Sequence, residues 1–263
     1  MTIYAGTLEQ QALQARVDIA MDWIMRTPGA CNGGRVLATD DPERLGWDTI
    51  AAILERDRAF AFRLLPVIEM NIIADRLEGM GYRLDTWTVF STGATTIRSK
   101  AWPIALDGPP EGYSELVIDE VTSPRVVAEY LDFIASRGLV PFSSAMMTGM
   151  LGPVEAVAAV DGDGRIVGSG FGYFPHNRFS DHAYAAWLGL LAVDEACRGK
   201  GVGQWINARV AMGLVERLGA QMVYELIADH NALSRRVVET CGFTRDPSLL
   251  SGIATRGRTR YTR

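Results

Sequence analysis

The sequence predicts a mixed α/β protein, with a mostly antiparallel central sheet, helices on both faces and two similar units. Short apolar or alternating runs typical of strands take turns with amphipathic runs typical of helices along the chain. The same succession of predicted strands and helices occurs in both halves of the chain. Hydrophobic residues make up 48% of the 263 residues, which is enough for a large core.

The second half of the chain gives the clearer pattern, in the order β-α-α-β-β-β-α-β-α-β. Its first helix begins after Ser123, a residue type that caps helix N-termini, and ends at Gly138. Residues 161–164, Asp-Gly-Asp-Gly, predict a hairpin turn because Asp and Gly accept positive φ angles. The predicted strands are 115–121, 154–160, 165–174, 182–193, 221–228 and a final edge strand at 251–263, and the predicted helices include 123–138, 201–220 and 231–243.

Two neighbouring elements of this half frame a glycine-rich loop. Residues 182–193 (HAYAAWLGLLAV) are nearly all apolar, as expected of a strand near the centre of a sheet. In residues 201–220, apolar side chains recur every four positions from Ile206 to Leu218, which predicts an amphipathic helix. The loop therefore joins a central strand to a helix.

The first half is a fainter copy of the later part of that order. The helices that begin near Asn71 and Asn231 can be superposed: each has a small residue three positions on and ends in Gly plus an aromatic residue. This similarity favours a duplicated unit, although amphipathic helices with such an ending are also common. The predicted strands of this half are 33–39, 59–66 and 83–92, and its helices are 46–57 and 67–82.

A stretch near the middle of the chain predicts the division between the units. Residues 102–115 (WPIALDGPPEGYSE) contain three prolines and two glycines and show no apolar periodicity. We therefore expect an N-terminal domain at 1–100, a linker at 101–114 and a C-terminal domain at 115–263.

Composition excludes several classes of protein. The formal net charge of −5 disfavours a nucleic-acid-binding protein, and no apolar run is long enough to predict a membrane span. The N-terminal residues lack the pattern of a secretory signal. Three cysteines suit neither a disulfide framework nor a metal site, so we expect a cytoplasmic protein that holds no metal.

The glycine-rich loop Arg198-Gly199-Lys200-Gly201-Val202-Gly203 predicts an anion site. Backbone N–H groups at a helix N-terminus have no intrahelical partner, and glycines let a phosphate approach them closely. Two other phosphate loops do not fit: Gln204 follows Gly203 where a P-loop needs Lys, and the glycine spacing is not that of a dinucleotide fingerprint. Spacing alone leaves a plain flexible turn as the alternative.

The sequence around this loop resembles the GNAT superfamily of N-acetyltransferases. Arg198, Gly201 and Gly203 match the family signature [RQ]-x-x-G-x-[GA], which follows its fourth strand. Asn231, Ser234, Val237, Gly242 and Phe243 match its later signature. The resemblance covers about residues 115–263 and implies the GNAT fold. The first half looks like the degenerate GNAT-like N-terminal domain of tandem members, where we expect no second acetyl-CoA site.

The resemblance also implies a donor site and a reaction. The fourth and fifth strands would splay apart to admit the pantetheine arm of acetyl-CoA. The backbone of Leu191, Ala192 and Val193 would contact this arm and polarise the acetyl carbonyl. The loop from Arg198 to Gly203 (Arg198, Gly199, Lys200, Gly201, Val202 and Gly203) would hold the pyrophosphate, and Asn231 and Ser234 would flank the arm. An amine would then attack the thioester directly.

Two departures from the family leave the acid and base open. Many relatives carry a Tyr where this chain has Val238, and many carry a carboxylate on the fourth strand, whereas residues 183–193 contain none. Alkyl amines need a base at neutral pH. Candidates near strand ends are Asp181, His182, Asp229 and His230, of which we favour Asp229 or His230 because both precede Asn231.

We expect an N-acetyltransferase that acts on a small-molecule amine. The stretch 123–151, where the family builds its acceptor site, is mostly apolar and disfavours a strongly cationic acceptor. One alternative is a non-catalytic acetyl-CoA sensor, favoured by the two departures, and another is a partner-binding protein. We expect no nucleic-acid or membrane partner, and a homodimer is left open.

Overall fold

The computed structural model describes residues 2–257, which form ten strands and ten α-helices. The strands are β1 (Ala30–Asn32), β2 (Leu37–Thr39), β3 (Ala59–Pro66), β4 (Arg83–Gly93), β5 (Tyr113–Val117), β6 (Val154–Asp161), β7 (Ile166–Tyr173), β8 (Ala185–Val193), β9 (Met222–Ile227) and β10 (Thr244–Thr255). The helices are α1 (Leu8–Ile19), α2 (Met21–Arg26), α3 (Pro42–Leu45), α4 (Trp47–Asp57), α5 (Val67–Gly79), α6 (Ala94–Leu106), α7 (Pro124–Ser136), α8 (Ser144–Met147), α9 (Val202–Glu216) and α10 (Ala232–Thr240), with a 3-10 turn at Glu195–Cys197.

All the strands belong to one sheet, in the order β1-β2-β3-β10-β4-β9-β8-β7-β6-β5. Neighbours are antiparallel except for the pairs β2–β3 and β8–β9, which are parallel. The predicted fold class, a mixed and mostly antiparallel sheet with helices, is confirmed. Most elements of the second half lie where the sequence predicted them.

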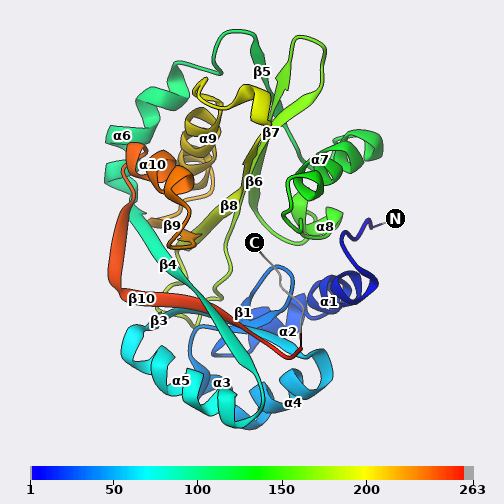
Figure 1. Cartoon of the computed structure of the whole chain (residues 1–263), viewed down its shortest axis with the longest axis vertical. Helices are drawn as coiled ribbons and strands as arrows, with labels where there is room; N and C mark the ends of the chain where they lie inside the picture. Colours follow the sequence, from blue (N-terminus) through cyan, green and yellow to red (C-terminus); the bar gives the residue numbers. More distant parts are fainter. Residues whose placement is uncertain (1, 258–263) are drawn as a thin grey trace.

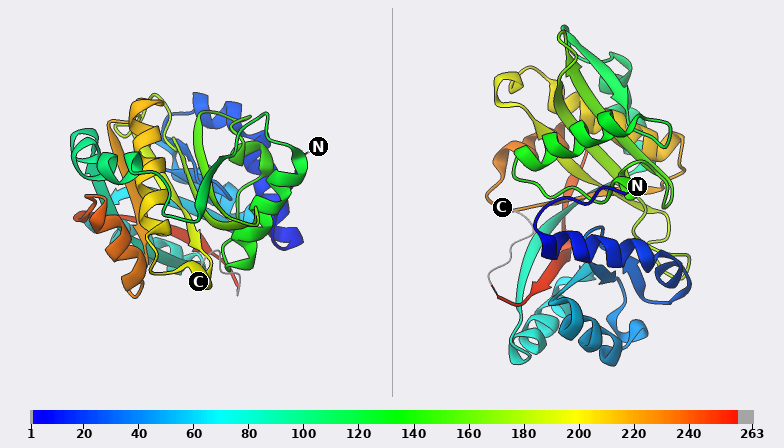
Figure 2. Two further views of the ribbon diagram at one scale, coloured as in Figure 1. Left: turned by 90° about the horizontal axis from the view of Figure 1, so that it is seen from above. Right: turned by 90° about the vertical axis from the view of Figure 1, so that its right-hand side faces the viewer.

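The two halves of the chain exchange their last strands. Strand β10, from the second half, lies between β3 and β4 of the first half, and β4 in turn pairs with β9 of the second half. The sheet order is therefore symmetrical about the β10–β4 pair, with β3 and β2 on one side and β9 and β8 on the other. Figure 2 shows the two halves along the length of the molecule, with these strands crossing between them.

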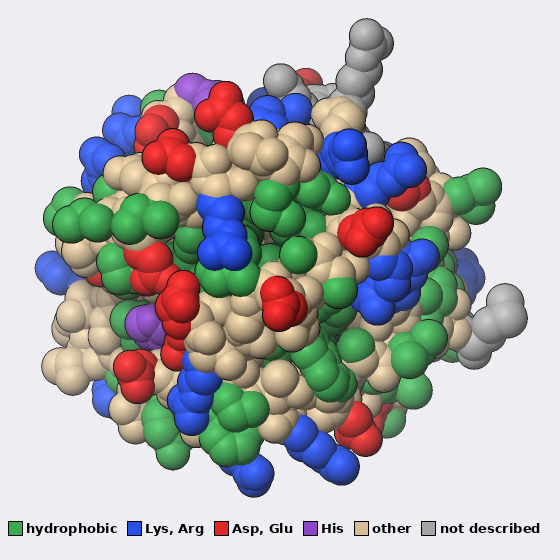
Figure 3. Space-filling model, turned by 90° about the horizontal axis from the view of Figure 1, so that it is seen from below, with side chains coloured by type: hydrophobic (Ala, Val, Ile, Leu, Met, Phe, Trp, Pro, Cys, Tyr) green, Lys and Arg blue, Asp and Glu red, His purple; other side chains and the backbone are tan. Residues whose placement is uncertain are grey.

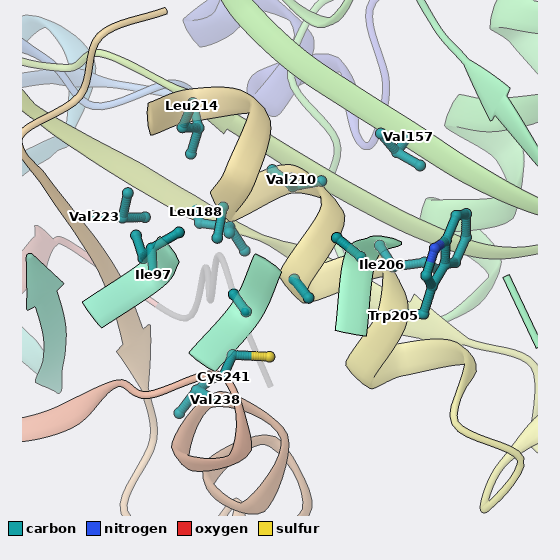
Figure 4. Packing of buried hydrophobic residues seen from close by; sticks show 14 of the residues in the cluster. Ile97, Val157, Leu188, Trp205, Ile206, Val210, Leu214, Val223, Val238 and Cys241 are labelled. Carbon is teal, nitrogen blue, oxygen red and sulfur yellow. The ribbon is translucent and has the colours of Figure 1, made fainter. Parts of the chain in front are cut away.

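Helices cover both faces of the second half of the sheet. Helices α6, α9 and α10 lie on one face, and α7 and α8 lie on the other (Figure 1). On the first face, Ile206, Val210 and Leu214 of α9 pack against Leu188 and Val157 of the strands (Figure 4). The end of the molecule seen from below carries acidic and basic side chains interspersed with hydrophobic ones (Figure 3).

The structure corrects both ends of the linker predicted at 101–114. Helix α6 extends to Leu106 and β5 begins at Tyr113, so only six residues, 107–112, lie between the elements. Pro103 lies inside α6. The helix forms because its apolar face, which includes Ile97 and Ala101, packs on α9, and this packing outweighs the local effect of proline.

The structure also corrects the predicted position of the final strand. The sequence predicted an edge strand at 251–263, but β10 begins at Thr244 and lies near the middle of the sheet. Local pattern does not reveal sheet order, which depends on pairing with β3 and β4 far away in the chain. Residues 258–263 of that prediction lie outside the described residues. Helices α1, α2 and α3 and strand β1 had no counterpart in the sequence analysis.

Candidate active site

The parallel strands β8 and β9 pair over only three residues and then diverge. The pairs are Ala185–Met222, Ala186–Val223 and Trp187–Tyr224. Beyond them the register of β8 with β7 shifts, and Leu190 takes a φ of 51°, a left-handed conformation rare for a residue other than glycine. The hydroxyl of Ser169 donates to the Leu190 carbonyl at 2.9 Å and fixes this bulge.

A cavity of about 320 Å³ occupies the region where the strands diverge. One side is built by β8 and β9 and by the start of α10. The other side comes from the first half of the chain, from the residues after α7 and from β10, so the strand exchange brings both halves to one cavity. The lining residues are Arg35, Arg63, Trp87, Arg137, Gly138, Leu139, Trp187, Leu188, Gly189, Leu190, Leu191, Glu225, Leu226, Ile227, Ala228, Asn231, Ser234, Ser251, Gly252 and Ile253.

The glycine-rich loop forms the N-terminus of α9. Gly199 and Gly201 have φ angles of 74° and 83°, which glycine adopts at low cost. The first hydrogen bond of the helix runs from the Trp205 amide to the Gly201 carbonyl at 3.0 Å. The amides of the three residues before Trp205 therefore have no partner within the helix, as an anion site requires.

The loop also has the open space and the charge that an anion needs. Arg198, Gly199 and Lys200 are exposed, and a Cβ atom added at Gly199 would meet no atom within 4 Å. Gly203 approaches β8 closely: a Cβ atom there would lie 3.3 Å from a methyl group of Val193. In the first half, α3 lies between β2 and α4, in the place that the glycine-rich loop takes between β8 and α9.

The structure places the predicted donor-site residues around one region. Leu191, Asn231 and Ser234 line the cavity, and Ala192 and Val193 continue β8 toward the loop. The side-chain oxygen of Asn231 caps α10 by accepting the Ser234 amide at 3.1 Å. The roles assigned to these residues and to the loop remain predictions.

The two predicted bases lie outside the cavity lining. Asp229 and His230 are exposed, and Asp229 accepts a hydrogen bond from the Thr88 hydroxyl at 2.5 Å. Val238, at the position of the tyrosine in many relatives, is buried in the core beside Cys241 (Figure 4).

Sequence reasoning missed Glu225, the carboxyl group among the lining residues. It lies on β9 where the strands diverge and is 5% exposed. Burial raises the pKa of Glu225 to about 8, although the nearby amide of Asn207 lowers it in part. Its Oε1 has no hydrogen-bond partner among the described residues. A single acidic residue in the apolar run QMVYELIA was the available signal.

Together the geometry defines a class of protein. A sheet whose parallel central strands diverge around a cavity, next to a helix N-terminus with free amides, is the arrangement that the resemblance to N-acetyltransferases implies. Residues 148–243 match the model of the Acetyltransferase (GNAT) family, which confirms the predicted resemblance over this stretch. GNAT proteins use acetyl-CoA. No curated protein matches the chain.

Solved structures share the fold over nearly the whole chain. A GCN5-related N-acetyltransferase from Kribbella flavida is 14% identical, with a TM-score of 0.56 over 94% of this chain and 96% of that chain. A tandem GNAT protein from the clavulanic acid biosynthesis pathway, solved without acetyl-CoA, is 14% identical, with a TM-score of 0.55 over 93% and 89%. A Drosophila protein gives 14% identity and a TM-score of 0.57 over 96% and 91%.

Proposed function

We propose that the protein is an acetyl-CoA-dependent N-acetyltransferase that acetylates a small-molecule amine. The observation that carries this proposal is the divergence of β8 and β9, which opens a cavity beside the glycine-built N-terminus of α9. A narrow acyl donor can pass between the strands and reach an acceptor in the cavity.

The residues present fit acetyl-CoA as the donor. The free amides at the start of α9, together with Arg198 and Lys200, would bind the pyrophosphate. Backbone groups of Leu191, Ala192 and Val193 would pair with the pantetheine amides where β8 has left β9. Asn231 and Ser234 would flank this arm at the start of α10. A backbone N–H of the Leu190 bulge would polarise the acetyl carbonyl.

In the reaction, the amine nitrogen bonds to the carbonyl carbon, the carbon–sulfur bond breaks, and CoA leaves as a thiolate, which takes up a proton from solvent. We assign the base to Glu225, because it lines the cavity whereas Asp229 and His230 do not. Its carboxylate would accept a proton from the amine, and its raised pKa makes it a stronger base than an exposed carboxylate. A pKa of about 8 lies close to the pH range in which a general base is most useful.

A non-catalytic acetyl-CoA sensor is the second candidate. Val238 favours it, since a buried valine cannot protonate the leaving thiolate. Two measurements on the same protein separate the candidates: the rise of the melting temperature with acetyl-CoA, and the release of free thiol with a panel of primary amines. We expect both. A rise without thiol release would favour the sensor, and the absence of a rise would refute acetyl-CoA as the ligand.

The remaining expectations about partners stay predictions. No helix within residues 2–257 is long and apolar enough to cross a bilayer. Cys31, Cys197 and Cys241 are free and buried. A cytoplasmic location, the lack of a nucleic-acid partner and the oligomeric state rest on the sequence analysis alone.

A further inference from the structure

The wall of the cavity that comes from the first half of the chain is basic. Arg35, from the turn between β1 and β2, and Arg63, from β3, both line it. They are only 8% and 5% exposed. Arginine is seldom buried to this extent unless a partner compensates its charge, so the pair calls for an explanation.

Both guanidinium groups are held in place by neutral groups. The Nε of Arg35 donates to the Val140 carbonyl, and its guanidinium carbon lies 4.8 Å from the centre of the Phe142 ring. Arg63 donates from Nη2 to the Gly33 carbonyl at 3.0 Å, and its guanidinium carbon lies 5.8 Å from the Trp187 ring centre. These contacts fix the geometry of the pair without neutralising its charge.

Within residues 2–257, neither Arg35 nor Arg63 has a carboxylate within 4.0 Å, the limit for a salt bridge. Asp40, a buried carboxylate of the same half, is bonded instead to His176 at 2.5 Å. Arg137, the third arginine of the lining, differs because Asp194 pairs with it at 2.9 Å. Burial and the neighbouring charge of Arg63 lower the pKa of Arg35 to about 10. The pKa of Arg63, although lowered by burial, is raised overall by the nearby Tyr173 and Tyr224.

The cavity lining also has hydrogen-bond donors without acceptors. The Nε atoms of Arg63 and Arg137 and the indole Nε1 of Trp187 are shielded from solvent and have no partner among the described residues. Buried donors are normally satisfied, so a set of unsatisfied ones in a cavity indicates a ligand rich in acceptor oxygens. A carboxylate has this chemistry and suits the forked geometry of arginine.

We infer that the acceptor is a small amine that also carries a carboxylate, bound through that carboxylate to Arg35 and Arg63 with its amine toward the diverging β8 and β9. This inference rests on the proposed function and specifies its substrate class. The cavity of about 320 Å³ restricts the acceptor to the size of an amino acid or a similar metabolite. Glu225 lines the same cavity.

Matched pairs of acceptors test the inference on the unmodified protein. Each pair consists of an L-amino acid and its amide, which have similar size and the same amine position, and acetyl-CoA-dependent thiol release gives kcat/KM for both. We expect the acid to exceed its amide by about 100-fold, the loss typical of a missing charged hydrogen-bond pair. Amides that react as well as the acids would overturn the inference but leave the proposed function standing. Absence of thiol release with every amine would overturn both.

The same assay includes a phosphate arm. O-Phosphoethanolamine and β-alanine both carry an anion beside a primary amine. A higher kcat/KM for O-phosphoethanolamine than for β-alanine would indicate that the site binds a phosphate rather than a carboxylate. That result would overturn the inference as stated.

Substitutions then locate the carboxylate site. Arg63→Gln is expected to lower kcat/KM for the acid by about 100-fold, with little change for the amide and with the KM for acetyl-CoA within about twofold. Arg63→Lys keeps the charge and should recover part of the loss. Arg125→Gln is the control: the side chain of Arg125 on α7 is 84% exposed and lies outside the cavity lining, so we expect a change below about twofold.

An equal loss for acid and amide in Arg63→Gln would overturn the assignment. So that misfolding does not affect the result, quenching of tryptophan fluorescence by each acid and amide is also measured in the unmodified protein, where Trp87 and Trp187 line the cavity. Quenching by the acids but not the amides supports the inference. Equal quenching by both contradicts it.

Discussion

The substitution Glu225→Gln is expected to change activity and stability in opposite directions. In the folded protein the pKa of Glu225 rises from 4.5 to about 8 because the group is buried. The carboxyl is then mostly protonated at neutral pH, and only about one-tenth of it is available as a base at pH 7. Gln has nearly the same shape but cannot accept the proton. We expect kcat to fall by about 100-fold or more.

The pH dependence of the two rates is the sharper measurement. Between about pH 7 and about pH 9, ionisation of Glu225 should raise the unmodified rate by about tenfold relative to that of the Gln variant. The amine acceptor also titrates in this range, but the ratio of the two proteins cancels its effect. A ratio near one that does not change with pH would refute Glu225 as the base. Asp229→Asn and His230→Gln are the controls. A flattened pH–rate profile in either variant would indicate that the residue replaced there, and not Glu225, is the base.

Stability should respond with the opposite sign. A carboxyl whose pKa is raised on folding stabilises the folded state fully below the unfolded pKa of 4.5, and this contribution is lost as the pH rises to about 8. The shift corresponds to at most about 5 kcal/mol. Gln does not ionise, so the melting temperature of the variant relative to the unmodified protein should rise by on the order of 10 °C across this range. A difference that stays constant with pH would contradict the raised pKa.

Three further predictions follow from the fold and the loop. Arg198→Ala combined with Gly201→Val should abolish the rise in melting temperature with acetyl-CoA. The free energy of unfolding of the free protein should fall by only about 1–2 kcal/mol, because the valine takes a positive φ. The exposed Arg125→Ala is the control, and retained acetyl-CoA binding in the double variant would contradict the loop assignment. Residues 107–263 expressed alone should not unfold cooperatively, because β10 loses its neighbours β3 and β4. Co-expression with residues 1–106 should restore folding. A cooperative unfolding transition in the fragment alone would refute this dependence on the first half. Glu155→Ala should lower the free energy of unfolding by about 2–4 kcal/mol, measured by urea unfolding, because the buried Glu155 pairs with Arg217 at 2.6 Å. An unchanged free energy of unfolding would show that the ion pair adds no stability.

The sequence by itself determined most elements of the second half and the glycine-rich loop. Helix α7 has its cap at Ser123, the turn at 161–164 has its Asp and Gly residues, and the loop from Arg198 to Gly203 has glycines at positions with positive φ. Such features depend on the conformational preferences of adjacent residues, so a local pattern is enough to predict them. The same patterns predicted the repeated unit of the first half.

Only the tertiary structure decided which residues meet at the cavity. The exchange of β4 and β10 brings Arg35 and Arg63 to the same cavity as Glu225, which is about 160 to 190 positions away in the chain. The local signal is only a single charge in an apolar run, as at Arg63 and Glu225, and an isolated charge normally predicts an exposed position. Burial, which shifts the pKa of Glu225 and leaves the arginines without carboxylate partners within the described residues, arises only when both halves pack into one sheet. The glycine-rich loop and its helix were therefore predictable from sequence, whereas the proposed base and acceptor site depend on how the two halves assemble.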